Sequence, residues 1–91
     1  DLYFNISKHA VDMAMKLKKA FEEKGYKFLY NSSTNQQFPI LPKNIASKLS
    51  EKYSFGLWKK IDENNSAFRF CTSWATKEED VNEFIEYLRN L

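Results

Sequence analysis

The chain has 91 residues and a mass of 10.8 kDa, which is enough for one small domain. Aromatic residues make up 16% of the chain and hydrophobic residues 43%, a composition that excludes an intrinsically disordered protein. Fourteen Lys and Arg against 12 Asp and Glu give a net charge of +2, which argues neither for nor against a nucleic-acid partner.

The first part of the chain predicts a long helix followed by two short strands. Apolar side chains recur at steps of three and four from Ile6 to Lys24, the period of an amphipathic helix. Gly25 is expected to end this helix, because glycine readily adopts the left-handed conformation at a helix C-terminus. The segments Tyr26–Tyr30 and Gln37–Leu41 are typical of strands. Because Pro39 cannot donate a ladder hydrogen bond, we expect the second strand at an edge or with a bulge.

The middle of the chain predicts a short helix and then a hairpin. Pro42 is expected to begin the helix, whose apolar stripe consists of Ile45, Ala46, Leu49 and Tyr53. The segments Phe55–Ile61 and Ala67–Ser73 both predict strands. Residues 62–66 are polar turn formers, so we expect them to join the two strands.

The strand at 67–73 alternates, so its side chains divide between two faces of the sheet. One face is expected to lie under the helices and the other to remain uncovered. The covered face would carry Phe68, Phe70 and Thr72, and the uncovered face Ala67, Arg69 and Cys71, with Trp74 just beyond. The uncovered face is apolar enough to suggest docking onto another surface.

The last element is a predicted helix with a local start signal. Thr76 precedes Glu79 by three residues, the spacing of a capping box. An apolar stripe follows, made of Val81, Phe84, Ile85 and Leu88. The element order is therefore α-β-β-α-β-β-α. This order predicts an α+β two-layer sandwich, a mostly antiparallel sheet with helices on one face, in a single domain at 1–91.

Several sequence features bear on location. No apolar run approaches the ~20 residues of a membrane span. Residues 1–10 lack the basic and apolar regions of a signal peptide, and the single cysteine excludes an internal disulfide framework. We therefore expect a cytoplasmic protein. Because the sequence does not begin with Met, we expect a piece of a longer chain.

Candidate reactive side chains are few. His9 is the only histidine and Cys71 the only cysteine, so one chain cannot assemble a zinc cluster. We expect His9 to be a surface residue without a catalytic role, and Cys71 to be buried and inert. The lysines of the first helix alternate with acids, which favours a solvated face over a phosphate-binding patch.

Arg69 needs an explanation, because it lies in mid-strand between two phenylalanines. One interpretation is structural: the side chain extends to water or pairs with an acid. The other is functional: a planar fork on a rigid strand suits two-point binding of a carboxylate or phosphate. The residue pattern alone leaves both open.

Residues 68–81, FRFCTSWATKEEDV, resemble the closing segment of the threonine aldolase and β-eliminating lyase family. These are fold-type I pyridoxal-phosphate enzymes with the aspartate aminotransferase fold. In that family a strand R-[FL]-[VC]-T-S-[WF] runs into a threonine-capped acidic turn and the final helix. Residues 33–42, STNQQFPILP, resemble the family's T-N-Q-x-F strand, and residues 9–17 resemble the helix that begins its small domain.

The resemblance implies that the chain is the small C-terminal domain of a larger lyase or aldolase that acts on an amino acid. Its reaction would be carbon–carbon cleavage of a β-hydroxy amino acid to glycine and an aldehyde, or a related β-elimination. Arg69 takes the position of the family arginine that binds the substrate's α-carboxylate. Pyridoxal 5'-phosphate and all catalytic and cofactor-binding residues would then belong to the large domain of the same chain, so the 91 residues alone are expected to be inactive and to bind no cofactor or metal. The parent is expected to be a homo-oligomer that binds an amino-acid substrate, and no nucleic acid or membrane.

Two other functions compete with this one. The chain could be a free-standing protein-binding module that uses its open sheet face. It could also be a small nucleic-acid-binding domain, an alternative supported by the pI of about 8.7 and the many aromatic residues. A longer reading frame with a pyridoxal-binding lysine upstream would favour the enzyme.

Overall fold

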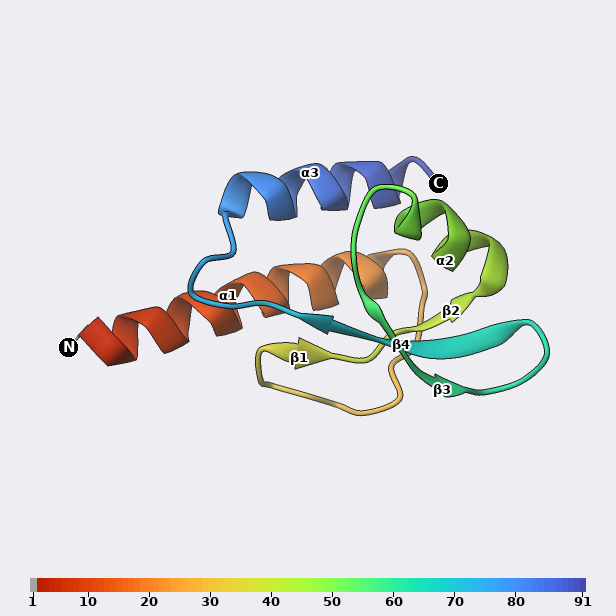
Figure 1. The fold of residues 1–91 in the computed structure, drawn as a ribbon, viewed down its shortest axis with the longest axis horizontal. Helices are drawn as coiled ribbons and strands as arrows, with labels where there is room; N and C mark the ends of the chain where they lie inside the picture. Colours follow the sequence, from red (N-terminus) through yellow and green to blue (C-terminus); the bar gives the residue numbers. More distant parts are fainter. Residues whose placement is uncertain (1) are drawn as a thin grey trace.

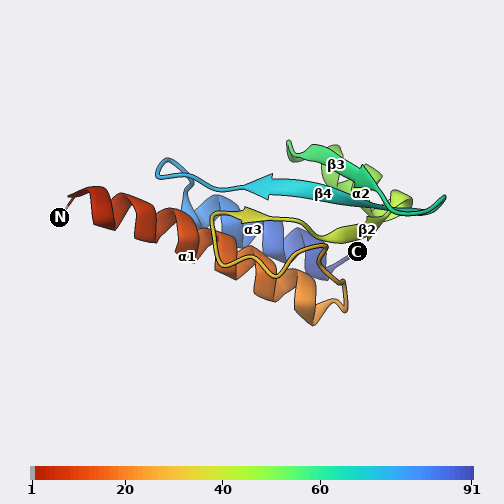
Figure 2. The same ribbon diagram turned by 90° about the horizontal axis from the view of Figure 1, so that it is seen from below.

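Two helices lie side by side against one face of a four-stranded sheet in the computed structural model, which describes residues 2–91 (Figures 1 and 2). The remaining helix, which is the second along the chain, lies beside the C-terminal end of the chain's last helix (Figure 1). The elements in chain order are α1 (Leu2–Glu23), β1 (Gln36–Gln37), β2 (Ile40–Pro42), α2 (Lys43–Ser50), β3 (Gly56–Lys60), β4 (Asn65–Cys71) and α3 (Glu78–Arg89). The predicted α+β architecture is confirmed. None of the described helices is both long and apolar enough to cross a membrane.

Helix α1 ends where the sequence predicts. Gly25 has φ +86°, and its N–H donates to the carbonyl of Glu22 (2.9 Å). The N–H of Tyr26 donates to the carbonyl of Phe21 (3.1 Å), which completes a Schellman motif. The rings of Phe21 and Tyr26 also lie edge to face at 6.3 Å, the hydrophobic contact that accompanies this motif.

The core lies between the helices and the sheet. Phe21 is fully buried at its centre, with the rings of Phe70 at 5.2 Å and Phe84 at 5.9 Å. The predicted stripes of α2 and α3 both point into this core, at Ala46 and Leu49 and at Val81, Phe84, Ile85 and Leu88. Tyr53 lies beyond the end of α2 but still packs on Phe84, with ring centroids 4.7 Å apart.

Strand β4 is the centre of the sheet, with β1 and β2 on one side and β3 on the other, all antiparallel. The predicted strand Gln37–Leu41 is interrupted. The carbonyl of Pro39 accepts a hydrogen bond from Phe68 N–H (3.0 Å), but proline has no N–H to donate in return. This separates β1 from β2 although both keep one register against β4.

The predicted strand Tyr26–Tyr30 is wrong in extent. Only an isolated bridge forms there, between Phe28 and Pro39. Two hydrogen bonds flank the bridge, from Leu29 N–H to the Phe38 carbonyl (2.9 Å) and from Ile40 N–H to the Lys27 carbonyl (2.8 Å). Because this segment covers Pro39 from outside, Pro39 is not at the sheet edge. The interruption at proline limits how far the pairing can extend.

The predicted hairpin between β3 and β4 is confirmed. Asp62 holds its turn, because its Oδ1 accepts from the N–H groups of Asn64 (2.8 Å) and Asn65 (2.9 Å). The register of β3 against β4 shifts between Leu57 and Lys59, so Trp58 lies at a bulge.

The two faces of β4 follow the predicted alternation with one exception. Phe70 (7% exposed) and Thr72 (4%) are buried and Phe68 is partly buried, whereas Arg69 and Cys71 are exposed. Ala67 was expected on the uncovered face, yet it is fully buried. Its side chain is a single methyl group between the longer cross-strand neighbours Ile40 and Lys59, which explains its burial.

The starts of α2 and α3 differ from the predicted ones in detail. Pro42 is the N-cap of α2, not its first helical residue. The predicted capping box does not form, because Lys77 is the N-cap of α3 and no side chain caps it. Thr76 Oγ1 instead accepts from Ser73 N–H (2.8 Å), which stabilises the loop before the helix.

Candidate functional site

The uncovered sheet face places Arg69 at its centre. Backbone pairing on both sides of β4 holds this residue, since Gly56 lies opposite it on β3 and β1 and β2 form the other flank. Its side chain is exposed. Among the side chains that the structure describes, no carboxylate forms a salt bridge with it. The guanidinium is therefore a rigidly mounted cation available to an anion.

Three aromatic side chains accompany Arg69, and we call them the aromatic cluster: Tyr30, Phe38 and Trp58. The carbon Cζ of Arg69 lies 5.9 Å from the centroid of the Trp58 ring. The ring centroids of Trp58 and Phe38 are 5.0 Å apart. The rings of Phe38 and Tyr30 lie edge to face, with their centroids 5.1 Å apart. The sequence analysis missed this cluster, because Tyr30 and Trp58 are 28 residues apart. The only available signal was the tryptophan in a predicted strand.

A hydrogen-bonded loop lies at the end of β4. Thr72 N–H donates to the carbonyl of Asn35 (3.0 Å), and Asn35 Nδ2 donates to the carbonyl of Thr72 (2.9 Å). Thr72 Oγ1 also donates to the carbonyl of Ala10 in α1. Gln37 Nε2 donates to the carbonyls of Ser32 and Thr34, both at 3.1 Å. The end of β4 that follows Arg69 is therefore fixed to α1 and to the loop before β1.

Cys71 and His9 differ in how well the sequence predicted them. Cys71 is exposed, so its predicted burial is wrong. It lies two residues after Arg69, on the same uncovered face, opposite Gln36. His9 Nε2 donates to the carbonyl of Thr76 (2.6 Å) and joins α1 to the loop before α3. It has a structural contact. Among the described residues, no three His, Cys, Asp or Glu side chains are grouped as metal ligands.

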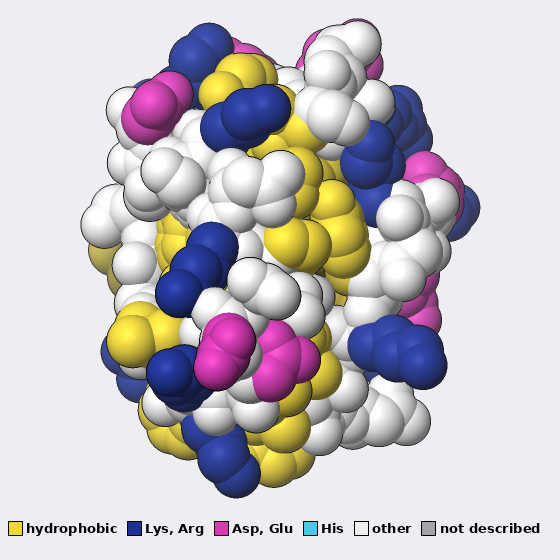
Figure 3. Space-filling model, turned by 90° about the vertical axis from the view of Figure 1, so that its right-hand side faces the viewer, with side chains coloured by type: hydrophobic (Ala, Val, Ile, Leu, Met, Phe, Trp, Pro, Cys, Tyr) yellow, Lys and Arg dark blue, Asp and Glu magenta, His cyan; other side chains and the backbone are white. Residues whose placement is uncertain are grey.

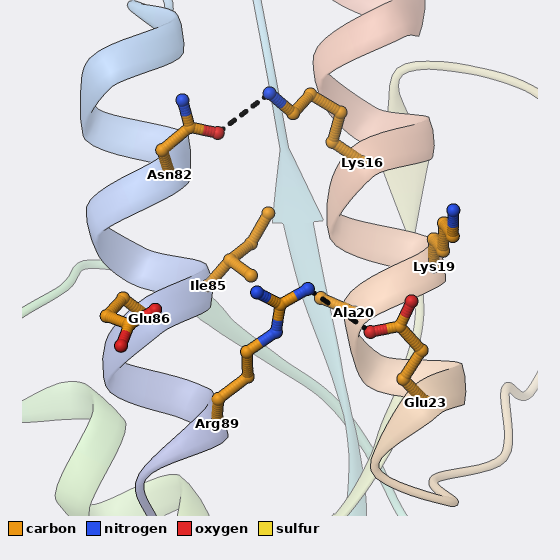
Figure 4. Close-up of a pocket in the computed structure, with 8 residues that line it drawn as sticks. All are labelled: Lys16, Lys19, Ala20, Glu23, Asn82, Ile85, Glu86 and Arg89. Carbon is orange, nitrogen blue, oxygen red and sulfur yellow. Dashed lines mark hydrogen bonds and ion pairs between the residues drawn. The ribbon is translucent and has the colours of Figure 1, made fainter.

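A hollow of about 400 Å³ lies on the helical side, between α1 and α3 (Figure 4). Two of its charged groups form contacts between the helices: Lys16 Nζ donates to Glu78 (2.9 Å) and to Asn82 Oδ1 (2.7 Å), and Arg89 contacts Glu23 (3.3 Å). Lys8 likewise pairs with Asp12 (2.7 Å). The contacts of Lys16, Glu23 and Arg89 join α1 to α3. Because these lysines contact acidic side chains, the ion pairs favour the predicted solvated face of α1 over a phosphate-binding patch.

Basic side chains are spread over the end of the molecule around α2 and the hairpin, with acidic ones among them (Figure 3). Lys, Arg, Asp and Glu side chains are interspersed there around hydrophobic ones (Figure 3). A nucleic-acid surface would instead gather Lys and Arg along one stripe. The view in Figure 3 thus gives no support to the nucleic-acid alternative.

The lysines among the described residues all lie at the surface of the molecule. No lysine among them is buried, and several are engaged in surface contacts, such as Lys18 with Asn31 (2.8 Å). A Schiff-base lysine needs a desolvated or electrostatically tuned position.

Comparison with solved structures shows that this chain is similar to a threonine aldolase. Threonine aldolase from Leishmania major matches this chain with a TM-score of 0.87 and 32% sequence identity, over 90% of this chain and 24% of that chain. No protein-family model and no curated protein sequence matches the chain. The predicted resemblance to threonine aldolase is confirmed. Because the match covers 24% of that enzyme's chain, this chain corresponds in size to one of its domains. Its architecture matches the small domain of the aspartate aminotransferase fold.

Proposed function

We propose that this chain is the small C-terminal domain of a pyridoxal-phosphate-dependent threonine aldolase or β-eliminating lyase. In this proposal Arg69 binds the α-carboxylate of the amino-acid substrate. The similarity to the Leishmania threonine aldolase supports the enzyme class, since 32% identity extends over 90% of the chain. The parent would be a cytoplasmic protein, as the sequence features led us to expect, and a homo-oligomer, as the family resemblance implies.

The observation that carries the proposal is the state of Arg69. The chain has two arginines, and they differ in their surroundings. Arg89 contacts the Glu23 carboxylate at 3.3 Å. Arg69, by contrast, is exposed on the uncovered sheet face, and its guanidinium lies over the ring of Trp58. A guanidinium presents its donors in a fixed fork that matches a carboxylate. Arg69 is the arginine suited to bind one.

The other side of the site would come from a large domain that faces the uncovered sheet face. Exposed large hydrophobic side chains lie on the chain at Tyr30, Leu57, Trp58, Ile61 and Trp74. Packing of a second domain on part of this surface would shield them from water. Closing the site in this way would also strengthen the attraction between Arg69 and a carboxylate, because water screens it less.

Pyridoxal phosphate, held by the large domain, would act as the electron sink of the reaction. This chain's contribution is orientation. A carboxylate fixed at two points cannot rotate freely, so the bond to be cleaved keeps one direction, and such positioning lowers the barrier. The 91 residues alone should be inactive. Adding pyridoxal phosphate to them should give no saturable, stoichiometric absorbance change; a change that one lysine variant abolishes would contradict this assignment.

Substitution of Arg69 in the full-length enzyme tests the carboxylate-binding role. Arg69→Lys keeps the charge but loses the two-point contact, so kcat/KM should fall about ten- to a few hundred-fold. Arg69→Ala should cost more, while the absorbance of bound cofactor and the thermal melt should change little. Arg89→Ala is the matched control, since it removes the other arginine. Near-normal activity of Arg69→Ala, or its unfolding, would show that Arg69 is structural.

A further inference from the structure

We infer that Trp58 is a positioning residue for Arg69: its indole face holds the guanidinium in the orientation that receives the carboxylate. The inference rests on the function proposed above. It adds a residue from a different strand, β3, to a site that the sequence assigned to β4 alone.

The first observation is the contact itself. Arg69 Cζ lies 5.9 Å from the centroid of the Trp58 ring, within the range in which a cation is attracted to an aromatic face. Tryptophan is the strongest partner for this contact, and a guanidinium can also stack on it through its plane. Stacking engages the face of the guanidinium and leaves its N–H groups at the edge free to donate. A stacked arginine can therefore still bind a carboxylate.

The second observation is the backbone that brings the two side chains together. Gly56 is the direct cross-strand neighbour of Arg69, and it has no side chain to compete for the space. A Cβ built on Gly56 would meet no atom within 4 Å, so the space beside Arg69 is open. The bulge in β3 then lies at Trp58. Bulges re-aim side chains, and this one places the indole diagonally across from Arg69.

The third observation is that Trp58 is itself held in place. Its ring packs on Phe38 at 5.0 Å, and its Nε1 donates to Tyr30 Oη at 3.5 Å. Phe38 is buried in the sheet and contacts Tyr30 in turn at 5.1 Å. Trp58 is 46% exposed, so these contacts hold the indole where one part of it meets solvent. Trp74 is more exposed, at 69%, and no contact joins it to Arg69 among the described residues.

Together these contacts reduce the freedom that Arg69 would lose on binding. A free arginine side chain has many rotamers, and fixing them costs affinity. Contact with Trp58 fixes part of the side chain in advance. A cation–π contact of this kind corresponds to about a three- to thirty-fold change in an equilibrium constant. Loss of Trp58 should therefore weaken substrate binding without removing the charge.

The test uses the full-length enzyme and three variants. Trp58→Leu should raise KM for the amino-acid substrate about three- to thirty-fold, with a smaller change in kcat. Trp58→Phe keeps an aromatic face and should restore most of the loss. Trp74→Leu, which removes the chain's other tryptophan, should leave KM unchanged. Equal effects of Trp58→Leu and Trp74→Leu on KM would overturn the inference.

A double-mutant cycle separates this inference from the proposed function. In the Arg69→Ala background, Trp58→Leu should have almost no further effect, because its action runs through Arg69. Two results would show that the positioning role is wrong while the carboxylate-binding role stands, provided that Arg69→Ala lowers kcat/KM. In the first, Trp58→Leu has no effect on the otherwise unmodified enzyme. In the second, Trp58→Leu has its full effect in the Arg69→Ala background as well. If Arg69→Ala has no effect, the proposed function fails and this inference fails with it.

Nuclear magnetic resonance of the 91-residue chain gives a readout independent of activity. The ring current of Trp58 should shift the Nε–Hε signal of Arg69. Trp58→Leu should move that signal toward the position of an unstructured arginine, while Arg89, the only other arginine, serves as the internal reference. Trp74→Leu should move neither signal. An Arg69 signal that is unchanged in Trp58→Leu would contradict the contact directly.

Discussion

Gly56 lies directly opposite Arg69 in the antiparallel register of β3 and β4. A larger residue here would place its Cβ about 5 Å from the Cβ of Arg69, the usual spacing of a cross-strand pair. With glycine, the nearest large group on β3 is Trp58, 5.9 Å from Arg69 Cζ. The absence of one side chain and the bulge that follows it thus define the surroundings of the candidate anion-binding residue.

The two glycines of the chain predict opposite responses to alanine. Gly25 has φ +86°, so Gly25→Ala should lower the free energy of unfolding by about 1–2 kcal/mol, although the new Cβ meets no atom within 4 Å. Gly56 carries no such backbone restriction, and Gly56→Ala should leave stability unchanged or slightly higher. Urea unfolding of both variants measures this. Equal losses at the two sites would mean that backbone conformation is not the cause.

Cys71 should be reactive in the folded chain. Its side chain is exposed on the uncovered sheet face, so a maleimide should label it completely without denaturant. The thermal melt should change little on labelling, because Cys71 lies outside the packed core. Mass spectrometry counts the adduct, and Cys71→Ser is the control for labelling elsewhere. Labelling that requires urea would show that the thiol is buried.

The Thr72 hydroxyl should contribute measurably to stability. It is buried and donates to the carbonyl of Ala10, which ties β4 to α1. Thr72→Val keeps the shape and removes the donor, so the free energy of unfolding should fall by about 1 kcal/mol. Ser50→Ala removes an exposed hydroxyl that bonds within α2, and it should be nearly neutral. If the two variants are equally stable, the buried bond adds nothing.

Features set by neighbouring residues were predictable from the sequence. The helix over α1 and its end at Gly25 depend on a local period and one glycine, and both were predicted. The alternation along β4 likewise placed Arg69 on the uncovered face. The starts of α2 and α3 were less predictable. Thr76 Oγ1 accepts from Ser73 N–H and not from an N–H group in the first turn of α3.

Features set by strand register were not predictable. Ala67 is buried because Ile40 and Lys59 flank it, and neither pairing can be derived from a single strand. Cys71 is exposed because it pairs with Gln36 at the end of the sheet, although the residue before it, Phe70, is apolar and buried. The approach of Trp58 to Arg69 depends on a one-residue bulge. The exposed position of Arg69 on the uncovered face could therefore be predicted, but the side chains around it could not.

Asp62 predicts how the hairpin responds to acid. The backbone hydrogen bond from Asn64, followed by the side-chain bond from Asn65, lowers the pKa of the Asp62 carboxyl below its usual value of 3.8. A depressed pKa in the folded state means that ionised Asp62 stabilises the fold at pH values above the unfolded pKa of about 3.9. This stabilisation is lost as the pH falls through the folded pKa.

The Asp62 carboxyl should therefore titrate below pH 3.8 in the folded chain, as followed by its carbon chemical shift. Asp62→Asn can still accept from the backbone N–H groups but does not ionise. Its Tm should consequently fall less than that of the unmodified chain between pH 5 and about pH 3. The difference isolates the Asp62 charge, because all other acids are shared. A carboxyl that titrates at or above its usual pKa, with parallel Tm curves for the two proteins, would show that the turn does not favour the ionised form.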